Sequence, residues 1–222
     1  MQQTAHENSD RHRPQGNSSP QGGGALEARE GRRKAEDHMA DLLAAYAAGH
    51  ESAFEELVEM AGGRLYAFLE RLLGDRHLAE DVYQTVLLRV ALRAGTFDRR
   101  ARFLTWLFRI ARNAAIDALR RNAAKTAMWP GGAPGSGGVD PEPTPEDACE
   151  AADERGILET RVREALSRLP EAQREAFLLK EEAGLSFEAI GDLVGCGAET
   201  AKSRYRYAVN RLRNALRPAG AE

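Results

Sequence analysis

Two short apolar segments near the carboxyl end of the chain flank a glycine turn: Ser186-Phe187-Glu188-Ala189-Ile190-Gly191-Asp192-Leu193-Val194-Gly195-Cys196-Gly197-Ala198-Glu199-Thr200-Ala201-Lys202-Ser203-Arg204-Tyr205-Arg206. Serine is a good helix N-cap, and Phe187, Ile190 and Leu193 recur at helical spacing. A turn of a few residues that contains glycine, between two short helices, is typical of a helix-turn-helix. Residues 186–217 therefore predict this motif.

The second helix of the motif has two chemically different faces. Its apolar face carries Ala201, Tyr205, Ala208 and Leu212, continued by Ala215 and Leu216. The other side offers cationic and hydrogen-bonding groups that can bind base edges or phosphates. The candidate residues that would read duplex DNA are Glu199, Thr200, Lys202, Ser203, Arg204, Arg206 and Tyr207. The alternative, a solvated basic face, is less consistent with the glycine turn and with the absence of acids from Thr200 to Arg217.

Charge is segregated along the chain, although the net charge of the 222 residues is only -3. Residues 96–125 carry eight basic side chains against two acids, and residues 200–217 carry six basic side chains and no acid. Residues 139–154 carry seven acids and no base. Two basic patches separated by an acidic tether favour a nucleic-acid partner more than the average charge suggests.

A second helix with an arginine stripe is predicted from Phe103 to about Asn122. Its polar side suits a phosphate backbone, and a short basic loop over 96–102 extends the stripe. Aromatic residues beside this loop could stack on unpaired bases, although Trp106 fits a core-edge position better. The candidate residues of this second DNA surface are Phe97, Arg99, Arg100, Arg102, Trp106, Arg109, Arg112 and Arg120.

The periodicity predicts an all-α chain of two small helical domains joined by a flexible linker, the second a helix-turn-helix domain of the winged-helix-like kind. We expect a disordered arm over 1–36, because it is rich in Gln, Gly, Ser and Pro. The first domain is predicted over 37–126, with helices starting near Met39 and near Leu78 and a glycine pair, Gly62-Gly63, at which the helix between them can bend. An acidic linker rich in proline and glycine covers 127–154, and the second domain covers 155–217.

Composition argues against several other classes of protein. The sequence shows no phosphate-binding glycine loop, no metal-spaced histidines and no nucleophile–base pair, so neither an enzyme, a metal site nor a cofactor is predicted. The two cysteines, Cys149 and Cys196, lie far apart and predict no disulfide framework. With neither a signal peptide nor a membrane span predicted, we expect a cytoplasmic protein.

Five motifs, in order along the chain, carry a family resemblance. Residues 72–84, LLGDRHLAEDVYQ, are similar to the pattern LLGDRxxAEDLVQ, and residues 103–120 are similar to FxxWLxRIARNxxxDxLR. Residues 166–175, LSRLPEAQRE, resemble LxxLPxxQRE; residues 184–191, GLSFEAIG, resemble GLSYEEIA; and residues 200–204, TAKSR, resemble TVKSR. Together they resemble the extracytoplasmic-function sigma factors, the small two-domain group of the sigma-70 family, over about 37–122 and 157–217.

The resemblance implies roles for both domains. The first would bind the β′ clamp helices of core RNA polymerase, through Asp81, Gln84 and Leu88. It would also melt the −10 promoter element, with a face that includes the loop 96–102, Arg109, Arg112 and Asn113. The second would contact the β flap and read the −35 element in the major groove. A cognate anti-sigma factor, which could hold the protein at the membrane, is also implied. The chain departs from the family pattern at Thr85, Ala91 and Tyr207.

A stand-alone helix-turn-helix regulator with a sensing or dimerising first domain is the alternative function. Such a regulator would bind an operator tightly without polymerase. A stand-alone regulator would not need basic side chains in both domains. The two basic surfaces therefore favour a promoter-specificity subunit of RNA polymerase over this alternative.

Overall fold

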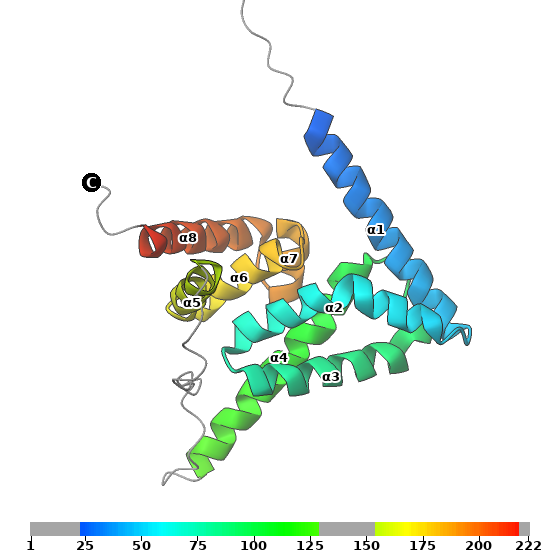
Figure 1. Ribbon diagram of the computed structural model, residues 1–222, viewed down its shortest axis with the longest axis horizontal. Helices are drawn as coiled ribbons and strands as arrows, with labels where there is room; N and C mark the ends of the chain where they lie inside the picture. The colour runs from blue at the N-terminus through cyan, green and yellow to red at the C-terminus, as the bar shows by residue number, and fades with distance from the viewer. Residues whose placement is uncertain (1–22, 129–153, 218–222) are drawn as a thin grey trace, which may run out of the picture. The chain divides into compact units, whose positions relative to one another are not determined.

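The computed structural model describes residues 23–128 and 154–217, which form α-helices and one 3-10 turn without a strand (Figure 1). In chain order the elements are α1 (Gly23–Ala47), α2 (Ser52–Leu73), α3 (Arg76–Arg93), η1 (Ala94–Thr96), α4 (Phe103–Met128), α5 (Glu154–Ser167), α6 (Glu171–Glu181), α7 (Phe187–Val194) and α8 (Ala198–Leu216). The predicted all-α class is confirmed.

The chain divides into two units, residues 1–35 and residues 36–222. Within the first unit, residues 23–35 are the amino-terminal turns of α1, and residues 1–22 lie outside the described part. The prediction of a disordered arm was therefore wrong for residues 23–36. From Ala25 onward Ala, Leu, Glu, Arg and Lys dominate, and these are strong helix formers, whereas both prolines and all but one of the glycines of residues 1–36 precede Ala25.

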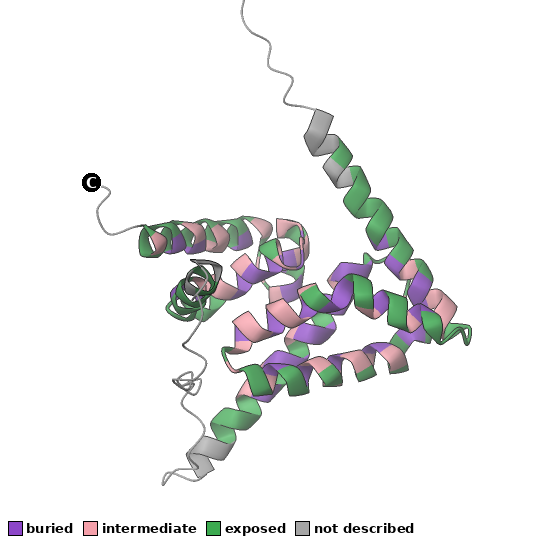
Figure 2. Cartoon of the chain, viewed as in Figure 1, coloured by how far each residue is buried: buried purple, intermediate pink, exposed green. Residues whose placement is uncertain are grey.

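Helices α2, α3 and α4 pack against one another, and the carboxyl-terminal part of α1 closes their core with Met39, Leu42 and Leu43. Figure 2 shows the buried residues where helices face each other and the exposed ones along the outer faces. Two local signals separate α2 from α3. Gly74 ends α2 in the left-handed conformation (φ 69°), and the Asp75 carboxylate accepts the Leu78 N–H at 3.0 Å as the N-cap of α3.

The glycine pair does not interrupt α2, which runs as one helix from Ser52 to Leu73, and a bend at the pair stays a prediction. Gly62 allows the Tyr83 side chain of α3 to approach. A Cβ at Gly62 would lie 2.6 Å from the Tyr83 hydroxyl, whereas a Cβ at Gly63 would meet open space. Gly62 therefore sets the contact between α2 and α3.

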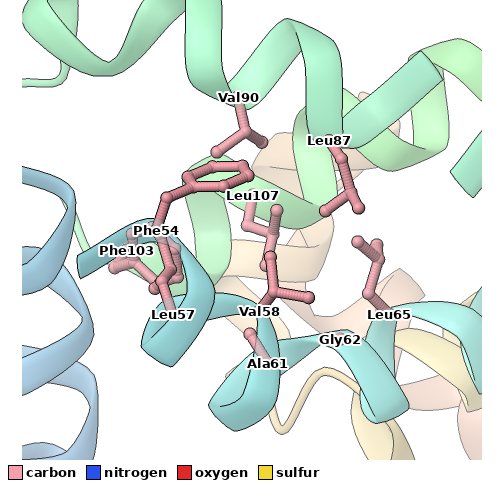
Figure 3. Close-up of a pocket in the computed structure, with 10 residues that line it drawn as sticks. All are labelled: Phe54, Leu57, Val58, Ala61, Gly62, Leu65, Leu87, Val90, Phe103 and Leu107. Carbon is pink, nitrogen blue, oxygen red and sulfur yellow. The ribbon is translucent and has the colours of Figure 1, made fainter. Parts of the chain in front are cut away.

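A small pocket lies inside this helical core (Figure 3). Its walls come from α2, α3 and α4: Phe54, Leu57, Val58, Ala61, Gly62, Leu65, Leu87, Val90, Phe103 and Leu107. All these side chains are apolar, and the pocket contains no group that could orient a polar ligand or transfer a proton. We interpret it as a packing gap between the helices.

Helices α5, α6 and α7 each contact α8. In residues 36–222, α2 also contacts α5 and α6, and α4 contacts α7, so helices of the two predicted domains touch. Helix α4 extends six residues beyond the predicted end near Asn122, and residues 129–153 of the predicted linker lie outside the described part. Among the helices that the structure describes, none has both the length and the apolar composition of a membrane span.

Candidate nucleic-acid interface

The turn between α7 and α8 has the geometry that the sequence predicts. The Ser186 hydroxyl accepts the Ala189 N–H at 3.2 Å as the N-cap of α7, and Gly195 ends that helix with φ 73°. Gly191 permits the tightest contact of the turn, because a Cβ there would lie 2.7 Å from the Cys196 carbonyl oxygen. The helix-turn-helix is thus held by local backbone geometry.

The inner face of α8 fixes its orientation. Ala201, Ala208 and Leu212 are buried as predicted, whereas Ala215 is exposed, because α8 reaches past the core at this end. The Tyr205 hydroxyl donates to Glu181 at 2.7 Å, and its ring stacks on Phe177 at a centroid distance of 6.0 Å. The hydrogen bond to Glu181, together with burial, raises the pKa of Tyr205 above its ordinary value, so this hydroxyl stays protonated and keeps donating.

The outer strip of α8 carries most of the predicted DNA-reading side chains. Six of the seven are exposed: Glu199, Thr200, Lys202, Ser203, Arg206 and Tyr207. Lys202 lies 3.6 Å from Glu199, a loose surface pair that leaves the ammonium free to move. The seventh, Arg204, is half-buried and donates to the Cys196 sulfur at 3.8 Å, so it lies against the turn of the motif.

The residues of the predicted second surface on α4 differ in how exposed they are. Arg109, Asn113 and Arg120 are exposed, but Arg112 is half-buried and forms an ion pair with Glu175 of α6. Trp106 packs at the core edge as expected, with its ring 5.1 Å from that of Phe97. The predicted surface therefore keeps three exposed polar side chains, those of Arg109, Asn113 and Arg120, beside an aromatic pair. Arg112 is instead engaged by Glu175 of the same chain.

The basic loop before α4 is partly neutralised by acids of α1. Arg102 binds the Glu36 carboxylate, and Arg99 pairs with Asp41. Arg100 is exposed, and its backbone N–H donates to the Asp98 carboxylate at 2.9 Å. Sequence reasoning missed Glu36 and Asp41, because nothing local links them to a loop more than fifty residues away; the absence of an acid in the first turn of α4 was the only signal.

The polymerase-binding residues that the resemblance implied share one exposed face of α3. Asp81, Gln84 and Leu88 recur at helical spacing, and Leu88 retains 62% of its exposure. Leu92, one turn further on, is 76% exposed and was not predicted. Two large exposed leucines on one helix face indicate a surface that another protein covers.

These features are those of a helical DNA-binding protein that has a second, arginine-bearing surface and an exposed apolar face on α3. The family model for sigma-70 region 2 matches residues 57–125, and that for sigma-70 region 4 matches residues 159–212. The first range contains the α3 face and the arginine surface of α4, and the second contains the helix-turn-helix.

Curated relatives and solved structures agree with the family models. The chain is 30% identical over 175 residues to the ECF RNA polymerase sigma factor SigW of Bacillus subtilis (strain 168), covering 76% of this chain and 91% of that protein. It is 34% identical over 169 residues to the RNA polymerase sigma factor CarQ of Myxococcus xanthus, with the same coverages. The chain thus belongs to the extracytoplasmic-function (ECF) sigma factors of the sigma-70 family, and it is an alternative sigma factor that directs promoter-specific transcription.

The fold resembles those of several solved structures. The sigma factor RpoE of Bartonella quintana, in complex with the anti-sigma factor NepR, matches with a TM-score of 0.59 and 27% identity over 73% of this chain and 96% of that one. CnrH, in complex with the cytosolic domain of CnrY, matches with a TM-score of 0.57 and 21% identity over 82% and 97% of the two chains. At 21% identity, the similarity to CnrH shows a shared fold alone.

Proposed function

We propose that this sigma factor holds promoter DNA at two places, with the outer strip of α8 on the −35 element and the loop and exposed face of α4 on the −10 element. The observation that carries this is the outer strip of α8, where Lys202, Ser203 and Arg206 stand exposed behind a glycine turn. Lysine and arginine in such a position can bind guanine or phosphate in the major groove.

At the −10 element, the exposed groups of α4 would bind the phosphate backbone. Arg109, Asn113 and Arg120 supply this contact, and Arg100 extends it into the loop. Phe97 and Trp106 pack beside the loop at the core edge, where part of an aromatic surface stays open to an unstacked base. We assign Arg99, Arg102 and Arg112 a lesser share, because each is paired with an acid.

The exposed face of α3 would dock on the β′ clamp helices of core RNA polymerase. Leu88 and Leu92 supply apolar area, and Asp81 and Gln84 flank it with groups that form directional hydrogen bonds. Interfaces of this kind combine an apolar centre with a polar rim. We infer that the helix-turn-helix domain contacts the β flap, as the resemblance implies.

We infer that the protein has no active site of its own and acts in the cytoplasm, where promoter DNA and polymerase are found. Two of its structural neighbours were solved with an anti-sigma factor and with the cytosolic domain of CnrY, respectively. We therefore propose a cognate anti-sigma factor as regulator, which could retain the protein at the membrane. The predicted domain limits, 37–126 and 155–217, remain part of this proposal.

Footprinting distinguishes this proposal from a stand-alone regulator. Promoters are first mapped from transcription starts that appear after overexpression. On such a promoter, the protein with core polymerase should protect both elements, whereas the protein alone should give no specific footprint. Specific protection by the free protein, at an affinity that polymerase does not change, would favour the stand-alone regulator.

A further inference from the structure

A glutamate of α1 is buried against the start of α4. Glu36 and Glu175 are the two buried charged residues among those that the structure describes, and Glu36 retains 5% of its exposure. One oxygen of its carboxylate accepts two hydrogen bonds from the Arg102 guanidinium, one from Nε at 3.0 Å and one from Nη2. The other oxygen accepts the backbone N–H of Leu104 at 3.2 Å.

The contact with Leu104 acts as a helix cap from a distant element. Helix α4 begins at Phe103, and the residue before it, Arg102, has no side-chain acceptor for the first N–H groups of the helix. A carboxylate at this position satisfies one of these donors and is attracted by the positive end of the helix dipole. Because the Glu36 carboxylate is almost fully buried, its hydrogen bond to Leu104 and its attraction to the helix dipole are stronger than they would be on the surface.

The same carboxylate holds the last residue of the loop that joins α3 to α4. The loop begins at Phe97, whose ring packs at 6.0 Å from the Phe103 ring. A local turn follows, in which the Ala101 N–H donates to the Asp98 carbonyl at 2.9 Å. Arg102, held by Glu36, is the last loop residue, and the exposed Arg99–Asp41 pair joins the loop to α1 a second time.

We propose that Glu36 is a positioning residue for promoter opening, which fixes the loop 97–102 and the first turn of α4 in the orientation that receives the −10 element. This rests on the proposed function. Glu36 acts through Arg102 and Leu104 and leaves Arg100 facing solvent. It would touch no DNA itself. A loop tied at both ends loses less conformational freedom when it binds DNA than a free loop does.

The test compares Glu36→Gln with Glu59→Gln in the full-length chain. Glutamine keeps the size of the side chain and removes the charge that holds Arg102. Glu59 is an exposed acid of α2, so its replacement makes the same change in net charge. Hydrogen exchange measured by mass spectrometry reports on residues 97–106, and 2-aminopurine in the −10 element of a mapped promoter reports on opening by the reconstituted holoenzyme.

We expect Glu36→Gln to speed exchange in residues 97–106 alone and to slow promoter opening by about tenfold, the effect of losing one charge-assisted hydrogen bond. Its affinity for core polymerase and its exchange in α2 and α3 should match those of Glu59→Gln. Unchanged loop exchange or unchanged opening would overturn the proposal. Faster exchange throughout residues 36–124, with polymerase affinity falling in parallel, would show a structural role only and overturn it too.

Two further arms keep the outcome interpretable. If Glu36→Gln does not fold, Glu36→Asp retains the charge on a side chain one methylene shorter, and the same localised loosening of the loop is expected. Exchange throughout the chain in this variant counts against positioning. If the wild-type holoenzyme opens no promoter, the proposed function fails, whereas the exchange measurement still decides whether Glu36 fixes the loop.

Discussion

Arg112 of α4 and Glu175 of α6 form an ion pair in which the arginine Nε lies 2.5 Å from one carboxylate oxygen and the Nη2 lies 3.5 Å from the other. Both side chains are largely withdrawn from water, at 18% and 11% exposure. The pair joins the helix that bears the second DNA surface to the helix-turn-helix part of the chain. While this pair is formed, the Arg112 guanidinium is not fully available to a phosphate.

Breaking the pair from either side should cost stability. Glu175→Gln is expected to lower the free energy of unfolding by about 1–3 kcal/mol, because the half-buried Arg112 loses its charged partner. Arg112→Gln should act similarly, and the double variant should lose less than the sum of the two. Urea unfolding of the four proteins measures the coupling, and strictly additive losses would contradict it.

The two exposed leucines of α3 should matter for polymerase binding and not for folding. Leu88→Ser and Leu92→Ser are each expected to weaken the affinity for core polymerase by tenfold or more, roughly the loss of 1.4 kcal/mol at an interface centre. The melting temperature should hardly change, since both side chains are exposed. Met60→Ser, an exposed apolar residue on α2, is the matched control. Equal affinities for all variants would remove α3 from the polymerase interface.

Arg206 and Lys202 should contribute to −35 recognition in ways that can be distinguished. Loss of a base contact at Arg206 is expected to cost about 1–3 kcal/mol and to relax preference at one position, whereas loss of a phosphate contact weakens all sequences alike. Holoenzyme binding is measured on promoters with single −35 changes over a range of salt concentrations. Arg213→Ala, an exposed arginine further along α8, is the control. If it weakens binding as much as Arg206→Ala does, the assignment of the outer strip is wrong.

Two glycine-to-alanine changes should have opposite effects on stability. Gly191→Ala places a Cβ 2.7 Å from the Cys196 carbonyl oxygen, a backbone atom that cannot move alone, so we expect a loss of about 1–3 kcal/mol. Gly63→Ala meets open space within α2 and should stabilise by about 0.5–1 kcal/mol, because alanine favours the helix. Thermal unfolding compares the two. A stable Gly191→Ala variant would mean that the turn of the motif is looser than described.

Much of the fold was predictable because its determinants are local. Apolar spacing set the helices, Ser186 capped α7, and glycines marked the turns, so the position of the helix-turn-helix follows from the amino-acid sequence alone. The outer strip of α8 followed from the same periodicity. The amino-terminal turns of α1 were missed because composition was averaged over residues 1–36, and the strong helix formers after Gly24 were diluted.

The contacts of the second surface could not be predicted in the same way, since they depend on tertiary packing. The helical wheel placed Arg112 on the polar face of α4, but it carried no information about Glu175, 63 residues away. The capping of Leu104 by Glu36 bridges 68 residues and leaves no local pattern. Leu92 was passed over because apolar residues are distributed around the whole of α3, so periodicity did not distinguish its exposed face from its buried one.

Promoter-specific transcription by reconstituted holoenzyme tests the function most directly. Core RNA polymerase from the source bacterium is incubated with and without this protein on promoters mapped after overexpression, and run-off transcripts are counted. We expect specific transcripts only with the protein, and their loss when either the −35 or the −10 element is scrambled. No gain over core polymerase on any mapped promoter would contradict the assignment of this chain as a promoter-specificity subunit.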